Sequence, residues 1–285
     1  MAPAHRRFSW LVSIVLVLLA SGQLPPLLAQ DVACKFEAFT YTNEGLTIRA
    51  GAFYLDDGQK HPVLVYNHGT PSSEGEGRPA WESIGAGLRC QIVRETGMVL
   101  FFAERRGYGG SDGMSFQAYI SQGTRKGSSE RGTRIVERLW QEAGDIETGI
   151  QYVANKPYVR PPVAIWGQSG GAVLALLLSS RAIPGLAGVI ASGPGFGWED
   201  RPDTLYGEPT AAAVEAGKKA QVPILLTVGQ NDVRLEMVRT MTQNLRDGGK
   251  DITSIEYPGM GHSWSWSRIG SEVVKFLGRV VRIAR

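Results

Sequence analysis

The chain has 285 residues, of which 43% are hydrophobic and 20% are charged, and its formal net charge is +3. This composition can bury one large core, so we expect a single globular domain of about 255 residues after an N-terminal leader. The small net charge provides no strong basic field and the sequence has no nucleic-acid-binding motif, which excludes nucleic acid as an expected partner.

Residues 1–30 have the pattern of a secretory signal peptide. Two arginines precede an apolar run of residues 10–20, and a proline-containing stretch then ends in small residues. The apolar run is short for a membrane span, so we expect residues 1–29 to be removed and the mature chain, residues 31–285, to lack a stable span. An uncleaved membrane anchor is the alternative. The prediction is a secreted or periplasmic protein, with cleavage after Gly22 or after Ala29.

The chain contains two cysteines, Cys34 and Cys90. Neither their spacing nor their neighbours suggest metal ligands. Since the mature chain is expected to enter an oxidising compartment, a disulfide between its N-terminal region and the first helix is one option and two free thiols are the other. Only the bond geometry can decide between them.

Strand patterns dominate residues 35–67, with a turn at residues 56–58, and a helix is predicted for residues 79–95. From there to the C-terminus, apolar runs typical of strands alternate with segments typical of helices, which is the signature of a parallel sheet covered by helices. The predicted strands span residues 98–103, 162–167, 187–192, 222–228 and 252–257, and the predicted helices span residues 134–156, 170–181, 211–219, 233–247 and 267–283.

Residues 163–178, VAIWGQSGGAVLALLL, are the most informative stretch of the chain. An apolar run is followed by Gly-Gln-Ser-Gly-Gly and then by a second apolar run that is long enough for a helix. This is the context of a nucleophile elbow, in which a sharp turn exposes a serine hydroxyl at the end of a sheet and leaves no room for flanking side chains. We therefore predict that Ser169 is a nucleophile. The alternative is a serine that only caps the helix.

A second Gly-x-Ser-x-Gly match is centred on Ser111. It follows a strand and a glycine-rich loop, but the residues after it are polar and do not continue into a helix. We therefore predict that Ser111 is a turn residue.

A serine nucleophile needs an imidazole base, and in the strand-turn-helix context the order along the chain is serine, acid, histidine. Of the four histidines only His262 follows Ser169, and it lies in a loop after a late strand. Among the carboxylates between them, Asp232 alone follows a strongly apolar run, PILLTVGQND, so we predict that it orients the imidazole. A simple helix-capping role for Asp232 is the alternative, and Asp203 and Asp200 are the other candidate acids.

An oxyanion hole requires two backbone N–H donors that point at one position. The amide of Gly170, directly after the nucleophile, is one candidate. The other comes from the loop after an earlier strand, where Pro71 has no N–H; we choose the Thr70 amide, with Gly69 as the next choice. His68 is predicted to be a structural residue beside the hole.

These motifs resemble those of α/β-hydrolases in their order and in their positions at strand ends. The resemblance covers residues 35–282 and implies an α/β-hydrolase fold: a mostly parallel eight-stranded sheet with helices on both faces, a minimal cap, and a site at the carboxyl ends of the strands. The matching pieces are HGT at residues 68–70, RRGYGGSDG at 105–113, GQSGG at 167–171, GQNDV at 229–233 and GMGH at 259–262.

Within this superfamily the chain is most similar to the dienelactone-hydrolase-like and prolyl-oligopeptidase-like group, on residues 145–171. It departs from dienelactone hydrolases in carrying a serine where they have a cysteine, which puts their lactone chemistry in doubt. It departs from prolyl oligopeptidases in showing no propeller-sized N-terminal domain, so we expect no size-selective gating of peptides.

Two segments could form a substrate wall. Residues 114–134 are polar and glycine-rich, and we predict a solvated loop there, with a substrate-facing flap as the alternative. Residues 193–210 are rich in glycine, proline and aromatic residues, and tryptophans also flank the histidine. Such aromatics either line an apolar pocket or pack in the core. The substrate-binding candidates are Gln168, Trp198 and Trp264.

The sequence thus predicts a carboxylesterase-like serine hydrolase, exported from the cytoplasm, that acts on a small-molecule ester through Ser169, His262 and Asp232 and an acyl-enzyme intermediate. The resemblance implies no metal ion and no organic cofactor. A peptidase or amidase of the prolyl-oligopeptidase-like type with the same triad is one alternative, and a non-catalytic binding protein with this fold is another.

Overall fold

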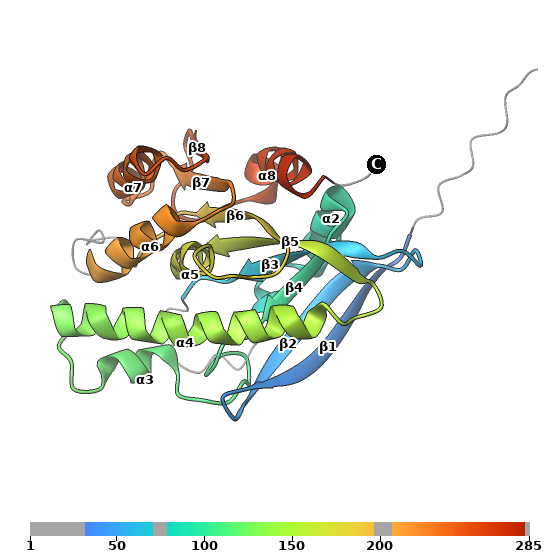
Figure 1. Ribbon diagram of the computed structural model, residues 1–285, viewed down its shortest axis with the longest axis horizontal. Coiled ribbons are helices and arrows are strands. Elements are labelled where there is room, and N and C mark those ends of the chain that lie inside the picture. Colours follow the sequence, from blue (N-terminus) through green and yellow to red (C-terminus); the bar gives the residue numbers. More distant parts are fainter. Residues whose placement is uncertain (1–31, 71–78, 197–206, 283–285) are drawn as a thin grey trace, which may run out of the picture. The chain divides into compact units, whose positions relative to one another are not determined.

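The computed structural model describes residues 32–70, 79–196 and 207–282 of the chain. The predicted signal peptide, residues 1–29, lies outside the described residues. The chain from Cys34 onward forms one compact unit, built on a sheet of eight strands with helices packed on it (Figure 1).

The sheet is antiparallel at one end and parallel elsewhere. β1 pairs antiparallel with β2 and β2 antiparallel with β4, and every further pairing is parallel. This confirms the predicted mostly parallel, eight-stranded sheet. In spatial order the strands are β1 (Cys34–Asn43), β2 (Leu46–Leu55), β4 (Val99–Ala103), β3 (His61–Asn67), β5 (Val159–Gln168), β6 (Leu186–Ser192), β7 (Ile224–Gly229) and β8 (Ile252–Tyr257).

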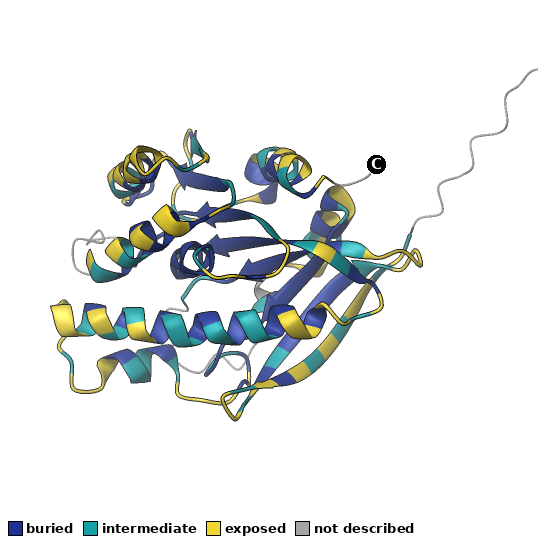
Figure 2. Ribbon diagram, viewed as in Figure 1, coloured by how far each residue is buried: buried dark blue, intermediate teal, exposed yellow. Residues whose placement is uncertain are grey.

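Helices cover both faces of the sheet, and each face has its own hydrophobic core. One core includes side chains of α3 to α7, and the other includes side chains of α2 and α8. The central strands are buried from both sides (Figure 2), as expected for parallel strands between two helical layers. The helices are α2 (Ala86–Thr96), α3 (Phe116–Ser121), α4 (Ser129–Val153), α5 (Gly170–Leu178), α6 (Gly207–Lys219), α7 (Leu235–Asp247) and α8 (Trp266–Val281), with a 3₁₀ turn, η1 (Ala80–Ser83).

Two predictions of local structure are wrong in part. The single helix expected over residues 79–95 is broken into η1 and α2, because Ile84 between them is extended. The loop expected over residues 114–134 contains α3 and the first turns of α4. Ser115 and Ser128 cap these two helices by accepting hydrogen bonds from backbone N–H groups. Phe116 and Ile120 of α3 are buried in the core, which stabilises a helix that the polar sequence around it conceals.

No helix within residues 32–70, 79–196 and 207–282 has the length and apolarity needed to cross a membrane.

Cys34, the first residue of β1, and Cys90, in α2, are joined by a disulfide. The bond closes a loop with a sequence separation of 56 residues.

Because closing a loop of that length removes conformational freedom from the unfolded chain, reduction of the disulfide should lower the free energy of unfolding by about 4 kcal/mol. Urea denaturation with and without a thiol reductant measures this difference. A Cys34→Ser/Cys90→Ser variant is the control, since its stability should not respond to the reductant; an equal response of both proteins would contradict the prediction.

Candidate active site

Ser169 occupies the turn between β5 and α5 in a backbone conformation that side-chain-bearing residues rarely adopt, with φ 55° and ψ −122°. Such a conformation costs on the order of 1–3 kcal/mol and persists only where the surroundings hold it. Its N–H donates to the Ser192 carbonyl at the end of β6, 2.9 Å away. The hydroxyl makes no cap hydrogen bond, so the alternative that Ser169 only caps α5 is wrong.

The glycines on either side of Ser169 are required by close backbone contacts. A Cβ on Gly167 would overlap the Gly171 carbonyl, and a Cβ on Gly171 would overlap the carbonyls of Asn67 and His68 at the end of β3. The turn therefore packs directly on the loop after β3. All nine residues of α5 are buried, which fixes the turn from its other side.

Asp232 and His262 lie together at the same edge of the sheet, after β7 and β8. His262 Nδ1 is 2.8 Å from Asp232 Oδ2. The side chain of Asp232 is 1% exposed and that of His262 is 28% exposed. Burial alone would raise the pKa of Asp232, but the hydrogen bond from His262, together with contacts from Arg234, outweighs it and lowers that pKa. Asp232 is thus an ionised acceptor, so His262 Nδ1 carries the proton and leaves Nε2 free to act as a base.

Arg234 is a buried cation beside this pair that was not predicted from the sequence. Its Nη1 lies 3.3 Å from Asp232 Oδ1 and 3.1 Å from His262 Nδ1. Its backbone N–H also donates to Asp232 Oδ1 at 3.0 Å, so Asp232 shapes the turn before α7 as well as contacting the imidazole. In the sequence, the feature that could have indicated this contact is the position of Arg234, two residues after the candidate acid.

The ends of β5, β6 and β7 are held in register by a row of buried hydrogen bonds. Ser192 Oγ accepts from Trp166 Nε1 at 3.0 Å and from Thr227 Oγ1 at 2.9 Å. A Cβ placed on Gly193, the next residue, would lie 3.3 Å from both Asp232 Oδ2 and His262 Nδ1. The end of β6 therefore contacts the Asp–His pair on one side and the Ser169 backbone on the other.

No hydrogen bond joins Ser169 to His262 in the described part of the chain. Catalytic hydrogen bonds are often long or poorly aligned without substrate and tighten in the complex. The structure thus joins two of the three predicted catalytic residues directly and places the third at the same edge of the sheet, on the far side of β6.

The loop after β3 lies against the serine. A Cβ placed on Gly69 would lie 3.3 Å from Ser169 Cβ, and one on Gly170 would overlap Thr70 Oγ1. Both candidate oxyanion residues, Thr70 and Gly170, are therefore side by side next to Ser169. His68 is buried, and its Nδ1 lies 2.7 Å from the Gly69 carbonyl oxygen. Burial and then the guanidinium of Arg105 hold the pKa of His68 well below its usual value, so the ring is neutral.

Ser111, the centre of the second glycine-serine motif, has two structural hydrogen bonds. Its hydroxyl donates to the Glu104 carbonyl at 2.8 Å and accepts from the Arg49 N–H at 2.9 Å. The side chain thus ties the loop after β4 to β2, in agreement with its prediction as a turn residue.

Glu104, at the end of β4, is 1% exposed, and its carboxylate accepts the Ala80 N–H at the start of η1. Burial raises its pKa to about 7 from an ordinary value of 4.5, against the opposing effects of the Ala80 N–H and the Arg105 guanidinium. Between pH 4.5 and about pH 7, Glu104 therefore holds a proton in the native protein that it releases in the unfolded chain. The resulting stabilisation is fully present below pH 4.5 and is lost as the pH rises through about 7.

Relative to Glu104→Gln, which cannot titrate, the wild-type free energy of unfolding should therefore fall by about 3 kcal/mol between about pH 4.5 and pH 8. Urea denaturation of both proteins at the two pH values measures this change. If the difference in free energy of unfolding between wild type and Glu104→Gln does not vary with pH, the raised pKa of Glu104 is contradicted.

The three residues predicted to bind substrate differ in where they lie. Gln168 is the last residue of β5 and lies beside the loop after β3. Trp264 packs on the Trp166 ring at a centroid distance of 4.8 Å and donates to the Tyr66 hydroxyl at 3.3 Å, and it also lines a small pocket with Asp232 and His262. Trp198 lies outside the described residues, as do the alternative acids Asp200 and Asp203.

Comparison with known proteins gives one family. The model of the dienelactone hydrolase family matches residues 108–273, a range that includes Ser169, Asp232 and His262. No curated protein matches the chain in sequence.

Solved structures of esterases share the fold. An esterase from Pyrococcus furiosus aligns with a TM-score of 0.61 and 15% identity, over 92% of this chain and 94% of that chain. A fungal esterase from Rhizomucor miehei aligns with a TM-score of 0.58 and 16% identity, over 98% and 93%. An esterase from Pyrobaculum calidifontis aligns with a TM-score of 0.59 and 16% identity, over 94% and 89%. These likenesses confirm the predicted α/β-hydrolase fold.

Proposed function

The chain belongs to the dienelactone hydrolase family and is therefore a hydrolase, and we propose that it is an exported serine hydrolase that cleaves carboxylic esters of small molecules. The observation that carries the proposal is the hydrogen bond between Asp232 and His262 at the sheet edge where the strained turn presents Ser169. The shared fold with several esterases supports an ester as the substrate class.

Acylation begins with attack of Ser169 Oγ on the ester carbonyl carbon. His262 Nε2 accepts the hydroxyl proton, and the ionised Asp232 stabilises the imidazolium that forms. When the tetrahedral intermediate collapses, the bond to the alcohol oxygen breaks and His262 returns the proton to that oxygen. The alcohol leaves, and the acyl group stays on Ser169.

Deacylation repeats these steps with water as the nucleophile. His262 accepts a proton from water as the oxygen attacks the acyl carbon. The bond from that carbon to Ser169 Oγ then breaks, His262 returns the proton to Oγ, and the carboxylic acid leaves. In both halves of the reaction a negative charge develops on the carbonyl oxygen. The Thr70 and Gly170 amides, which lie side by side next to Ser169, are the donors that we assign to it.

Two observations support export. The leader has the composition of a signal peptide, and the disulfide between Cys34 and Cys90 is a bond that persists in oxidising compartments and is rare in the bacterial or eukaryotic cytosol.

A panel of chromogenic substrates tests the proposed chemistry. We expect the purified protein to hydrolyse p-nitrophenyl esters of short acyl chains at least about 10² times faster, by kcat/KM, than the matching p-nitroanilides. Faster cleavage of X-Pro p-nitroanilides would indicate a peptidase with the same triad. Failure to hydrolyse any member of the panel would contradict the proposed function and favour a binding protein.

A further inference from the structure

A buried arginine on the loop after β4 contacts the loop that carries the assigned oxyanion donor. Arg105 is 2% exposed. Its Nη1 donates to the His68 carbonyl oxygen at 2.9 Å, and its Nε lies 2.7 Å from Glu142 Oε2 of α4. The guanidinium also lies over the Tyr108 ring, 4.9 Å from its centroid. One side chain thus connects the longest helix to the residue before Gly69 and Thr70.

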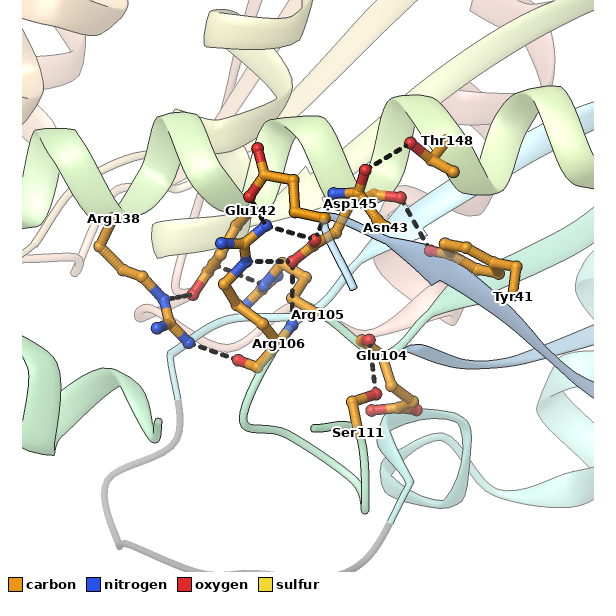
Figure 3. Close-up of polar contacts among 11 residues, drawn as sticks. Tyr41, Asn43, Glu104, Arg105, Arg106, Ser111, Arg138, Glu142, Asp145 and Thr148 are labelled. Atoms are coloured by element: carbon orange, nitrogen blue, oxygen red, sulfur yellow. Dashed lines mark hydrogen bonds and ion pairs between the residues drawn. The ribbon is translucent and has the colours of Figure 1, made fainter. Parts of the chain in front are cut away.

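The connection is rigid because every charge in it is buried and partnered. Glu142 is 1% exposed, and its second oxygen accepts from Arg138 Nε at 2.8 Å (Figure 3). Arg138 in turn donates to the Arg106 carbonyl oxygen. A buried charge that loses its partner is strongly unfavourable, so the side chains hold one arrangement. Arg105 therefore fixes the position of the His68 carbonyl relative to α4.

Fixing a carbonyl also fixes the N–H of the same peptide, because the peptide unit is planar and trans. The bond from Arg105 thereby orients the His68–Gly69 peptide. The next peptide is oriented by the His68 ring, whose Nδ1 lies 2.7 Å from the Gly69 carbonyl oxygen. Because a carbonyl oxygen can only accept a hydrogen bond, Nδ1 is the donor. That peptide includes the Thr70 N–H, the assigned donor to the oxyanion.

We propose that Arg105 is a positioning residue for the oxyanion hole: through the His68 carbonyl it holds the loop so that the Thr70 amide points at the carbonyl oxygen of the substrate. The proposal rests on the proposed function, since it requires Ser169 to be the nucleophile. It assigns a role to a residue that touches neither the substrate nor the Asp–His pair.

Arg106 provides a matched control. It is the next residue, is buried, and forms an ion pair with the α4 carboxylate of Asp145 through two bonds of 2.9 and 2.8 Å. Its guanidinium also bonds to Glu44 in the turn between β1 and β2. Arg106→Met and Arg105→Met therefore each remove a buried ion pair to the same helix, but only Arg105→Met removes the bond to His68.

The test compares kcat, KM and the affinity of a trifluoromethyl ketone, which forms a tetrahedral adduct with the serine, in wild type and both variants. A small misplacement of a catalytic group costs about 10²-fold, so we expect kcat and ketone affinity of Arg105→Met to fall by about that factor, with KM changed less than about threefold. Arg106→Met should lose comparable thermal stability while kcat stays within about threefold of wild type. Equal kcat values of the two variants would overturn the proposal.

Arg105→Lys keeps the test decisive if Arg105→Met does not fold. A lysine retains the buried positive charge, but its single ammonium cannot reproduce the guanidinium bonds to both Glu142 and His68, so kcat should still fall at least about tenfold. Wild-type kcat in Arg105→Lys would overturn the proposal. A wild-type protein without ester hydrolysis would instead contradict the proposed function, which separates the two failures.

Discussion

Ser169→Ala is expected to lower kcat for ester hydrolysis by about 10⁶, because the variant lacks the atom that forms the acyl-enzyme. The residual rate would come from substrate binding and from the oxyanion donors, which do not depend on the hydroxyl. The hydroxyl makes no cap hydrogen bond, so its removal should leave the free energy of unfolding nearly unchanged. Steady-state kinetics with a p-nitrophenyl ester, and urea denaturation of the same preparations, measure both quantities.

Ser111→Ala is the matched control, since Ser111 is the centre of the other Gly-x-Ser-x-Gly motif. Its hydroxyl is buried and has partners on β2 and at the end of β4, so its loss should cost about 1–3 kcal/mol of stability. The folded fraction should retain wild-type kcat. A Ser169→Ala variant with more than about 1% of wild-type kcat would contradict the assignment of the nucleophile.

Asp232→Asn is expected to lower kcat of the folded protein by about 10⁴. The amide can donate to His262 Nδ1, and this bond favours the tautomer in which Nε2 carries the proton and cannot accept one from Ser169. Arg234 reinforces the effect, because its Nη1 lies 3.1 Å from the same Nδ1 and can also donate to it. The pH dependence of kcat/KM, measured with wild type and variant, reports the loss of the base.

The structure contains a second Asp–His contact that serves as the control for this variant. In the turn before β3, Asp57 Oδ1 lies 2.9 Å from His61 Nε2. Asp57→Asn changes a similar pair at the opposite end of the strands, so it should leave kcat unchanged. Equal losses of kcat in the two variants would indicate a general effect on folding, and wild-type kcat in Asp232→Asn would exclude Asp232 as the orienting acid.

Much of the fold could be predicted because its strongest determinants are local. The strands from residue 98 onward are apolar runs bounded by turn residues, and their predicted limits differ from β4, β6, β7 and β8 by at most two residues. The β5 strand begins three residues before its predicted range of 162–167, at Val159, and it includes two prolines, which are uncommon inside strands. The elbow was recognisable because glycine, serine and the change from strand to helix occur within 16 consecutive residues.

The parts that escaped prediction depend on contacts between distant segments. The helix α3 is stabilised by burial of Phe116 and Ile120 in a core made by other elements, which its polar neighbours in sequence do not reveal. The contact of Arg105 with His68 joins residues 37 positions apart. The contact of Arg234 with His262 spans 28 positions. Charge and periodicity identify such arginines only as polar residues after a strand, and the fold determines which partner they contact.

The most direct test of the central claim, that Ser169 is an activated nucleophile, is reaction of the purified protein with a fluorophosphonate. Intact mass and tryptic peptide mapping should show one adduct, located on the peptide of residues 139–181 and assigned to Ser169. The Ser169→Ala variant should show none, and Ser111→Ala should be labelled like wild type. A folded protein that forms no adduct, or forms it on another residue, would contradict the account.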